Sequence, residues 1–247
     1  MSEPLTPLEV LAEDFERVLC IPAHPDDMEY GAAAAVARWV SQGKHVAYAL
    51  VTSGEAGIDS LDPEQAKPLR EAEQRAACAA VGVDTVEFLG FPDGVLEYGL
   101  PLRRGIAAAI RRHRPDIVVT VNQRDSFGPG MLNMADHIVT GRAVVDAARD
   151  AGNRWVFRDL LDEGLEPWNK VRMVLASGSP EATHAVDIDG FFEAGIASLK
   201  AHEAYLAAFG EDTGQVEEML EGFARMAGSR IGVKLATSFE AYPINLL

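Results

Sequence analysis

The stretch from residue 18 to residue 40 constrains the fold of this chain more than any other. The apolar run Val-Leu-Cys-Ile at residues 18–21 is followed by His-Pro-Asp-Asp at residues 24–27, and then by small residues from Gly31 to Val40. A short apolar run that stops at prolines favours a strand, whereas alanine and valine at helical spacing favour a helix. The stretch therefore predicts a strand, a tight turn and a helix. Its polar residues lie at the carboxyl end of the strand, where open α/β sheets bind their ligands.

The first half of the chain repeats this alternation of strand and helix. Strands are predicted at residues 17–23, 45–52, 85–89 and 116–121, and helices at residues 28–43, 68–81, 100–113 and 135–151. Four repeats with connections of ordinary length predict a Rossmann-like, doubly wound α/β fold, in which helices cover both faces of a mostly parallel sheet.

The rest of the chain is less regular. Residues 1–14 are expected to form a leader with a short surface helix, and residues from about 210 to 247 a C-terminal extension with one helix and a mixed tail. Between them, strands are predicted at residues 172–176 and 185–188 and a helix at residues 191–208. Because no repeat, low-complexity tract or linker interrupts the sequence, we expect a single domain over residues 1–247.

Composition excludes several classes of protein. The 247 residues include 38 acidic and 22 basic side chains, which gives a net charge of -16. Nucleic acids and anionic membrane surfaces require a cationic footprint, so neither is an expected partner. No stretch approaches the ~20 apolar residues of a membrane span, the N-terminus lacks the pattern of a signal peptide, and the two cysteines fit a reducing compartment. We expect a cytoplasmic protein that acts on a small molecule, and the sequence leaves open whether it forms a homo-oligomer.

The polar turn after the first strand has two interpretations. Asp26 and Glu29 have the spacing of a capping box, in which both side chains satisfy the first N–H groups of a helix. Alternatively, His24 at the end of the strand and Asp27 three residues later could turn a nitrogen and a carboxylate oxygen towards one metal ion, a combination that zinc accepts. Asp26 would then lie beside the metal without binding it, free to act as a base.

A third ligand is predicted at the same edge of the sheet. His137 follows the loop after the fourth strand and falls in the first turn of the next helix. By itself it could be a histidine beside a helix cap formed by Asn133. Since parallel strands carry His24 and His137 to the same edge, we favour a metal site with three protein ligands and an open position, as in catalytic zinc sites. Another divalent ion such as Fe²⁺ is compatible with the same donors.

The sequence also resembles a known family. Residues 23–29, Ala-His-Pro-Asp-Asp-Met-Glu, are similar to the signature of the zinc-dependent N-acetylglucosaminyl-phosphatidylinositol de-N-acetylase family, which includes the LmbE-like proteins. The resemblance extends over roughly residues 17 to 205. It includes Thr-Ser-Gly-Glu-Ala-Gly at 52–57, Arg-Glu at 70–71, Ala-Ala at 76–77, Leu-Gly-Phe-Pro-Asp-Gly at 89–94, Asp-His at 136–137, Gly-Arg at 141–142 and Lys-Ala-His at 200–202.

The resemblance implies an LmbE-like fold and a zinc-dependent hydrolase that removes an N-acyl group, expected to be acetyl, from an amino sugar or a related small amide. It makes His24, Asp27 and His137 the zinc ligands and Asp26 the general base that takes a proton from a metal-activated water. Two further positions, Arg70 and Asp93, resemble residues that contact the substrate.

One position departs from the family pattern. The distal motif of the family usually reads His-x-Asp-His, and its first histidine helps to stabilise the oxyanion or to protonate the leaving amine. This chain has Met134 there, which can neither protonate nor donate a hydrogen bond. Three alternatives follow: Asp26 moves the proton alone, His202 substitutes for the missing acid, or the chain is a binding protein that keeps a metal without hydrolysis. A further alternative for the reaction is an amidase acting on a thiol conjugate or a secondary metabolite.

Overall fold

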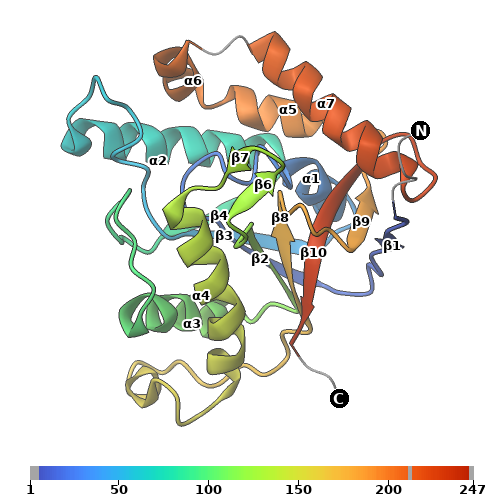
Figure 1. Ribbon diagram of the computed structural model, residues 1–247. Helices are drawn as coiled ribbons and strands as arrows, with labels where there is room; N and C mark the ends of the chain where they lie inside the picture. Colours follow the sequence, from blue (N-terminus) through green and yellow to red (C-terminus); the bar gives the residue numbers. More distant parts are fainter. Residues whose placement is uncertain (1–5, 211–212, 245–247) are drawn as a thin grey trace.

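An eight-stranded sheet forms the centre of the computed structural model, which describes residues 6–210 and 213–244 (Figure 1). The strand order is β1-β9-β10-β8-β5-β2-β3-β4. The strands are β1 (Glu9–Val10), β2 (Arg17–Ile21), β3 (His45–Leu50), β4 (Thr85–Phe88), β5 (Ile117–Val121), β8 (Met173–Ser177), β9 (His184–Asp187) and β10 (Ala236–Pro243). From β8 to β4 all neighbours are parallel, whereas β10 is antiparallel to β8 and to β9. The predicted doubly wound, mostly parallel sheet is confirmed.

Helices cover both faces of the sheet. The apolar cluster on one face includes residues of, or packed against, α1 (Ala33–Ser41), α2 (Pro63–Ala80), α5 (Phe192–Lys200) and α7 (Thr213–Ser229). The cluster on the other face is built by α3 (Leu100–His113) and α4 (Ala135–Gly152), which pack on each other. The remaining elements are α6 (Glu203–Phe209), a 3₁₀ turn at Arg158–Leu161 and a small hairpin of β6 (Ser126–Gly128) and β7 (Met131–Leu132).

The central strands read as continuous apolar runs because both of their faces are buried. In β2, Val18 and Cys20 belong to the cluster beneath α1, while Leu19 and Ile21 belong to the cluster beneath α3 and α4. Successive side chains of a strand point to opposite faces, so a run of four buried residues serves two cores at once. This arrangement fixes β2 in the middle of the sheet.

The sequence prediction missed two strands at the sheet's far edge. Residues 9–10, expected within a helical leader, form β1 and pair with β9. The expected mixed tail contains β10, which fills the gap between β8 and β9. This strand was hidden by Glu240, a charged residue that is nevertheless buried because Arg124 and Ser179 satisfy its carboxylate. Residues 1–5 of the expected leader lie outside the described residues.

Three helix boundaries also differ from the prediction. α1 begins at Ala33, after a tight turn in which the Met28 carbonyl accepts hydrogen bonds from three successive N–H groups. α2 begins at Pro63 because Asp62 caps it, and Pro68 lies inside the helix. The helix predicted at 191–208 is divided into α5 and α6, with His202 at the N-cap of the second.

Within the described ranges, none of the helices combines the length and the apolar character that crossing a membrane requires.

Arg111 is a fully buried cation on α3 that anchors the C-terminal end of α4. Its guanidinium donates to the carbonyl oxygens of Ala151 at 3.1 Å, Asn153 at 2.8 Å and Val156 at 3.0 Å. These acceptors include the last carbonyls of a helix, which have no partner within the helix itself. Arg111 therefore ties α4 to α3 at the end of α4 that is distant from its first turn.

We predict that Arg111→Met lowers the free energy of unfolding by about 3 kcal/mol, because several carbonyl groups would stay buried without a donor. The neighbouring substitution Arg112→Met is the matched control. Arg112 is 46% exposed and pairs with Glu87, so its loss should change stability by less than about 1 kcal/mol. Urea denaturation of both variants measures the difference, and equal effects would contradict the anchoring role.

Candidate metal centre

The candidate ligands meet at the carboxyl edge of the sheet. His24 follows β2, and His137 lies in the first turn of α4, after the loop that leaves β5. Because β2 and β5 are parallel neighbours, with Ile21 opposite Thr120, both segments emerge at the same edge. Candidate ligand atoms of His24, Asp27 and His137 all lie within 4.8 Å of one another. The structure thus brings the three predicted ligands together.

The Asp27 carboxylate is the hub of this group. Its Oδ2 accepts a hydrogen bond from the backbone N–H of His24 at 2.8 Å, which fixes the carboxylate in the turn. Its Oδ1 faces both rings, at 2.9 Å from His137 Nε2 and 3.7 Å from His24 Nδ1. One oxygen is therefore used for structure and the other is directed at the two imidazoles.

The outer nitrogen of each histidine has an acceptor. His24 Nε2 lies 3.1 Å from Asp93 Oδ1 and 3.3 Å from Asp136 Oδ2. His137 Nδ1 lies 3.1 Å from Asn133 Oδ1. An acceptor on one ring nitrogen favours a proton there, so that the other nitrogen would be the one to bind a metal when it gives up its proton. The donor set, two imidazole nitrogens and one carboxylate oxygen, fits a zinc-type ion.

Backbone groups hold the outer carboxylates in place. Asp136 accepts hydrogen bonds from the N–H groups of Gly94 at 2.8 Å and Leu96 at 3.1 Å, and Asp93 Oδ2 accepts from Ala56 N–H at 2.8 Å. Asp93, predicted to contact the substrate, thus also contacts His24. The loops after β3 and β4 and the start of α4 are joined around this one imidazole.

The charges of the group favour a cation. Burial lowers the pKa of His24, but the carboxylates of Asp27, Asp136 and Asp93 outweigh this effect and raise the pKa to about 12. Burial raises the pKa of Asp27, yet His137 and His24 hold it well below its ordinary value. The Asp27 carboxylate is therefore ionised and surrounded by partners that compensate its charge.

Asp26 occupies a strained turn beside the group. Its φ of 84° lies in the left-handed region, which residues other than glycine rarely adopt. Its N–H donates to Gln74 Oε1 at 3.0 Å, so the predicted capping box is absent. Glu29 instead accepts from Gln74 and Ser198, each at 3.2 Å.

Asp26 is buried, with only 5% of the residue exposed. Burial raises its pKa to about 7, against the opposing effect of Arg70, whose Nη2 lies 3.7 Å from Asp26 Oδ2. A carboxyl group in this range can exchange a proton near neutral pH. The predicted base thus lies next to the three ligands in a low-dielectric setting.

Arg70, the second predicted substrate contact, is 1% exposed. Its Nη2 donates to the Pro25 carbonyl at 2.7 Å, and its guanidinium stacks on the Tyr205 ring with 3.5 Å between Cζ and the ring centroid. In this arrangement Arg70 supports the turn that carries Asp26 instead of presenting a free cation to a substrate.

Met134 replaces the histidine that acts as an acid in the family pattern, and His202 is the predicted substitute for it. The two residues have different surroundings. Met134 is 52% exposed at the N-cap of α4. His202 is fully buried, its Nε2 lies 3.8 Å from Glu29 Oε2, and it is close enough to Asp26 to oppose the rise in the pKa of that carboxyl group. His202 is therefore not part of the candidate ligand group, although it lies close to the neighbouring Asp26.

Sequence reasoning missed several residues that support the site. Asn133 was recognised only as a helix cap, and Gln74 and Tyr205 carried no pattern at all. Asp136 was quoted as part of a motif without a role. Their contacts are made across elements, so only Asp136, adjacent to His137, offered a hint in the sequence.

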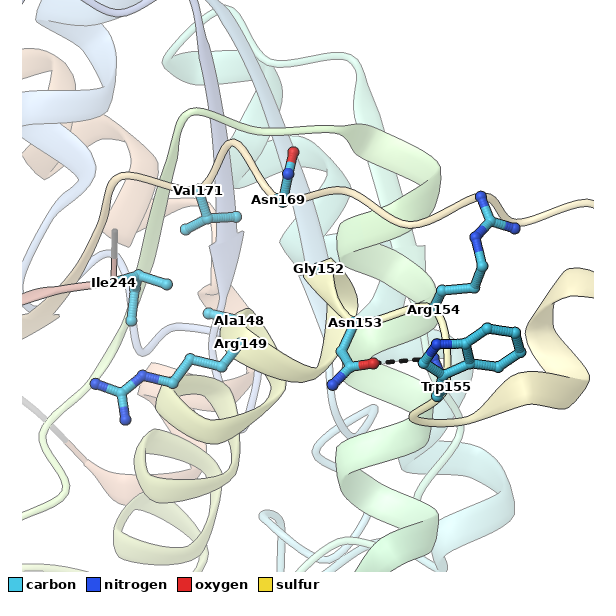
Figure 2. Close-up of a pocket in the computed structure, with 9 residues that line it drawn as sticks. All are labelled: Ala148, Arg149, Gly152, Asn153, Arg154, Trp155, Asn169, Val171 and Ile244. Atoms are coloured by element: carbon cyan, nitrogen blue, oxygen red, sulfur yellow. Dashed lines mark hydrogen bonds between the residues drawn. The ribbon is translucent and has the colours of Figure 1, made fainter. Parts of the chain in front are cut away.

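A separate hollow lies at the far end of α4 (Figure 2). It is lined by Arg149, Arg154 and Trp155, among other residues, and the backbone N–H of Trp155 donates to Asn153 Oδ1 at 2.9 Å. None of the predicted site residues lines it.

The fold and this group define an α/β protein with a candidate metal centre at the carboxyl edge of its sheet. The family profile described as PIG-L, GlcNAc-PI de-N-acetylase, matches residues 19–148. The chain therefore belongs to the PIG-L family. This membership confirms the resemblance and the enzyme class expected from it, an N-deacetylase hydrolase.

Individual relatives agree with the family assignment. Diacetylchitobiose deacetylase of Thermococcus kodakarensis is 28% identical over 233 residues, which cover 93% of this chain and 84% of the relative. A 1D-myo-inositol 2-acetamido-2-deoxy-alpha-D-glucopyranoside deacetylase of Thermomonospora curvata is 26% identical, over 81% of this chain and 84% of the relative. The fold matches N,N'-diacetylchitobiose deacetylase from Pyrococcus horikoshii with a TM-score of 0.84 and 24% identity, over 94% of this chain and 85% of that one.

We predict that the free energy of unfolding of Asp26→Gly is about 1 kcal/mol higher than that of Asp26→Ala. Both changes remove the carboxylate, but only glycine adopts a φ of 84° without strain. Urea denaturation of the two variants measures how much the strained backbone at residue 26 lowers the free energy of unfolding. Equal stabilities would mean that the turn is not strained at this residue.

Proposed function

We propose that this chain is a metal-dependent N-deacetylase that hydrolyses the acetamide of an N-acetylated amino sugar. The observation that carries the proposal is the convergence of His24, Asp27 and His137, each with its second polar atom already occupied. The deacetylases named among the relatives, which act on diacetylchitobiose and on an acetamido sugar linked to inositol, support the substrate class.

We propose His24, Asp27 and His137 as the metal ligands and Zn²⁺ as the ion, with Fe²⁺ as a compatible alternative. A divalent ion bound there would lower the pKa of a water molecule and polarise the amide carbonyl. Its charge would also offset the acidic side chains that crowd His24, namely Asp27, Asp93 and Asp136.

Asp26 is the proposed general base. Its carboxyl group is adjacent in sequence to a ligand, buried, and free of a hydrogen bond at Oδ2. It takes the proton from the attacking water as the tetrahedral intermediate forms. It then gives that proton to the nitrogen of the departing amine, so that acetate and a free amino sugar are released.

Two features narrow the roles of the other predicted residues. Asp93 remains the proposed substrate contact, since it lies at the edge of the ligand group. Arg70 acts through the turn, because its guanidinium is covered by Tyr205.

Two alternative functions would use the same candidate metal centre. An amidase for a thiol conjugate or a secondary metabolite would share every residue role and differ only in substrate. A metal-retaining binding protein without turnover is motivated by Met134, since a positioned acid contributes about 10²–10⁴-fold to such a reaction. Turnover on a panel of amides separates these possibilities.

The purified protein is expected to bind one equivalent of zinc and to release acetate from at least one member of a panel of N-acetylated sugars. Asp27→Ala should abolish both metal binding and turnover, because it removes the hub carboxylate. Asp26→Asn should keep the metal and lower kcat by about 10²–10⁴-fold. Metal analysis and an acetate assay measure these effects, and wild-type turnover by Asp26→Asn would refute the proposed base.

The supporting amide of Asn133 gives an independent prediction. Asn133→Ala removes the acceptor of His137 Nδ1 and should weaken zinc binding by about 10–100-fold. Asn169→Ala, at the distant hollow, is the control and should leave zinc affinity unchanged. Competition with a chelator measures both affinities, and unchanged affinity in Asn133→Ala would show that the ring is oriented by other contacts.

A further inference from the structure

One face of α2 carries three polar side chains into the interior. Arg70, Glu73 and Gln74 follow the spacing that places residues on one side of a helix, and all three are buried. Arg70 donates to the Pro25 carbonyl, and Gln74 accepts from the N–H of Asp26. α2 therefore holds the turn of the proposed base from two sides.

The third of these side chains holds a different element. Glu73 Oε1 accepts a hydrogen bond from the N–H of Ala204 in the first turn of α6. Leu206, two residues further on, is buried. The same helix face thus anchors both the Asp26 turn and α6, and it brings the two together.

This anchoring of α6 places Tyr205 beside the turn that carries Asp26. Its ring lies on the Arg70 guanidinium and against the loop after β3, where a Cβ atom on Gly57 would lie 3.4 Å from Tyr205 Cε2. Its hydroxyl group is hydrogen-bonded to the side chain of Asp26. Ring, loop and hydroxyl together fix the position of this side chain.

Other described residues offer the Asp26 carboxylate little support. Arg70 Nη2 is 3.7 Å from Oδ2, which is longer than a hydrogen bond, and Oδ2 has no hydrogen-bond partner among the described residues. A tyrosine phenol, whose ordinary pKa is about 10, is protonated at neutral pH and can act as the donor.

We propose that Tyr205 is a positioning residue for Asp26, whose carboxylate it holds towards the ligand group through the Tyr205 hydroxyl. The proposal rests on the function given above, in which Asp26 is the base. It supplies a hydrogen-bond donor next to the base in a chain that has Met134 in place of a histidine. Because Tyr205 acts through Asp26, its contribution should vanish when the Asp26 carboxylate is removed.

The test compares Tyr205→Phe with the wild-type zinc protein. Tyr205→Phe keeps the ring on Arg70 and removes only the hydroxyl, so zinc content and melting temperature should not change. The kcat should fall between about 10- and 100-fold, the size expected for a misplaced catalytic group, while KM is unchanged. Tyr98→Phe is the matched control, because Tyr98 donates a hydroxyl hydrogen bond to Asp146 at 2.7 Å on the exposed surface.

A double variant distinguishes positioning from an independent contribution. Asp26→Asn with Tyr205→Phe should have the kcat of Asp26→Asn alone, because coupled residues are not additive. Full additivity, or wild-type kcat in Tyr205→Phe, overturns the proposal.

Crystal structures supply a measurement that does not require activity. The Tyr205 hydroxyl should lie within hydrogen-bond distance of the Asp26 carboxylate in the wild-type protein, and the carboxylate should rotate or lose order in Tyr205→Phe. The same carboxylate position in both structures overturns the proposal. Absence of acetate release by the wild-type protein would instead contradict the proposed function, with the crystallographic comparison still deciding the role of Tyr205.

Discussion

The parallel pairing of β2 with β5 is the constraint on which the candidate site depends. These strands lie side by side in the centre of the sheet, and both end at the same edge. The turn after β2 carries His24 and Asp27, and the segment after β5 leads to His137. Neither strand contains a candidate site residue, yet their buried side chains on both faces determine where the candidate ligands lie. A slip of one residue between them would exchange the two faces of a strand and move the turn.

A second layer of the site is built from charged groups taken into the interior. Burying an unpaired charge is expensive, and the structure offsets that penalty with specific contacts. Asp27 is compensated by two imidazoles and Asp136 by two backbone N–H groups. Arg70 is covered by an aromatic ring. The Asp26 carboxyl keeps one oxygen without a hydrogen-bond partner, as do the Glu29 and Glu73 carboxylates, but its pKa is raised to about 7 and it is the group proposed to move a proton.

Much of this arrangement could be predicted from the sequence because it follows from local patterns. The alternation of apolar runs and helical segments gave the parallel sheet, and the sheet gave a common edge for His24, Asp27 and His137. The supporting contacts could not be predicted in the same way. Gln74 and Tyr205 reach Asp26 from helices that are distant in sequence, and their residue types are common on helices of any kind. Strand β10 was not predicted because the charge of buried Glu240 obscures its apolar pattern. The break before α6 was not predicted because it depends on Glu73 of another helix.

The hub contact between Asp27 and His137 joins positions separated by 110 residues of the chain. A cation held by both would close a loop of that length, as a disulfide bond would, and restrict the unfolded chain in the same sense. Such an ion binds the folded protein in preference to the unfolded one and stabilises it by mass action. The centre would then act as a removable cross-link between the turn after β2 and the first turn of α4, so that the resistance of this protein to unfolding would depend on the supply of metal.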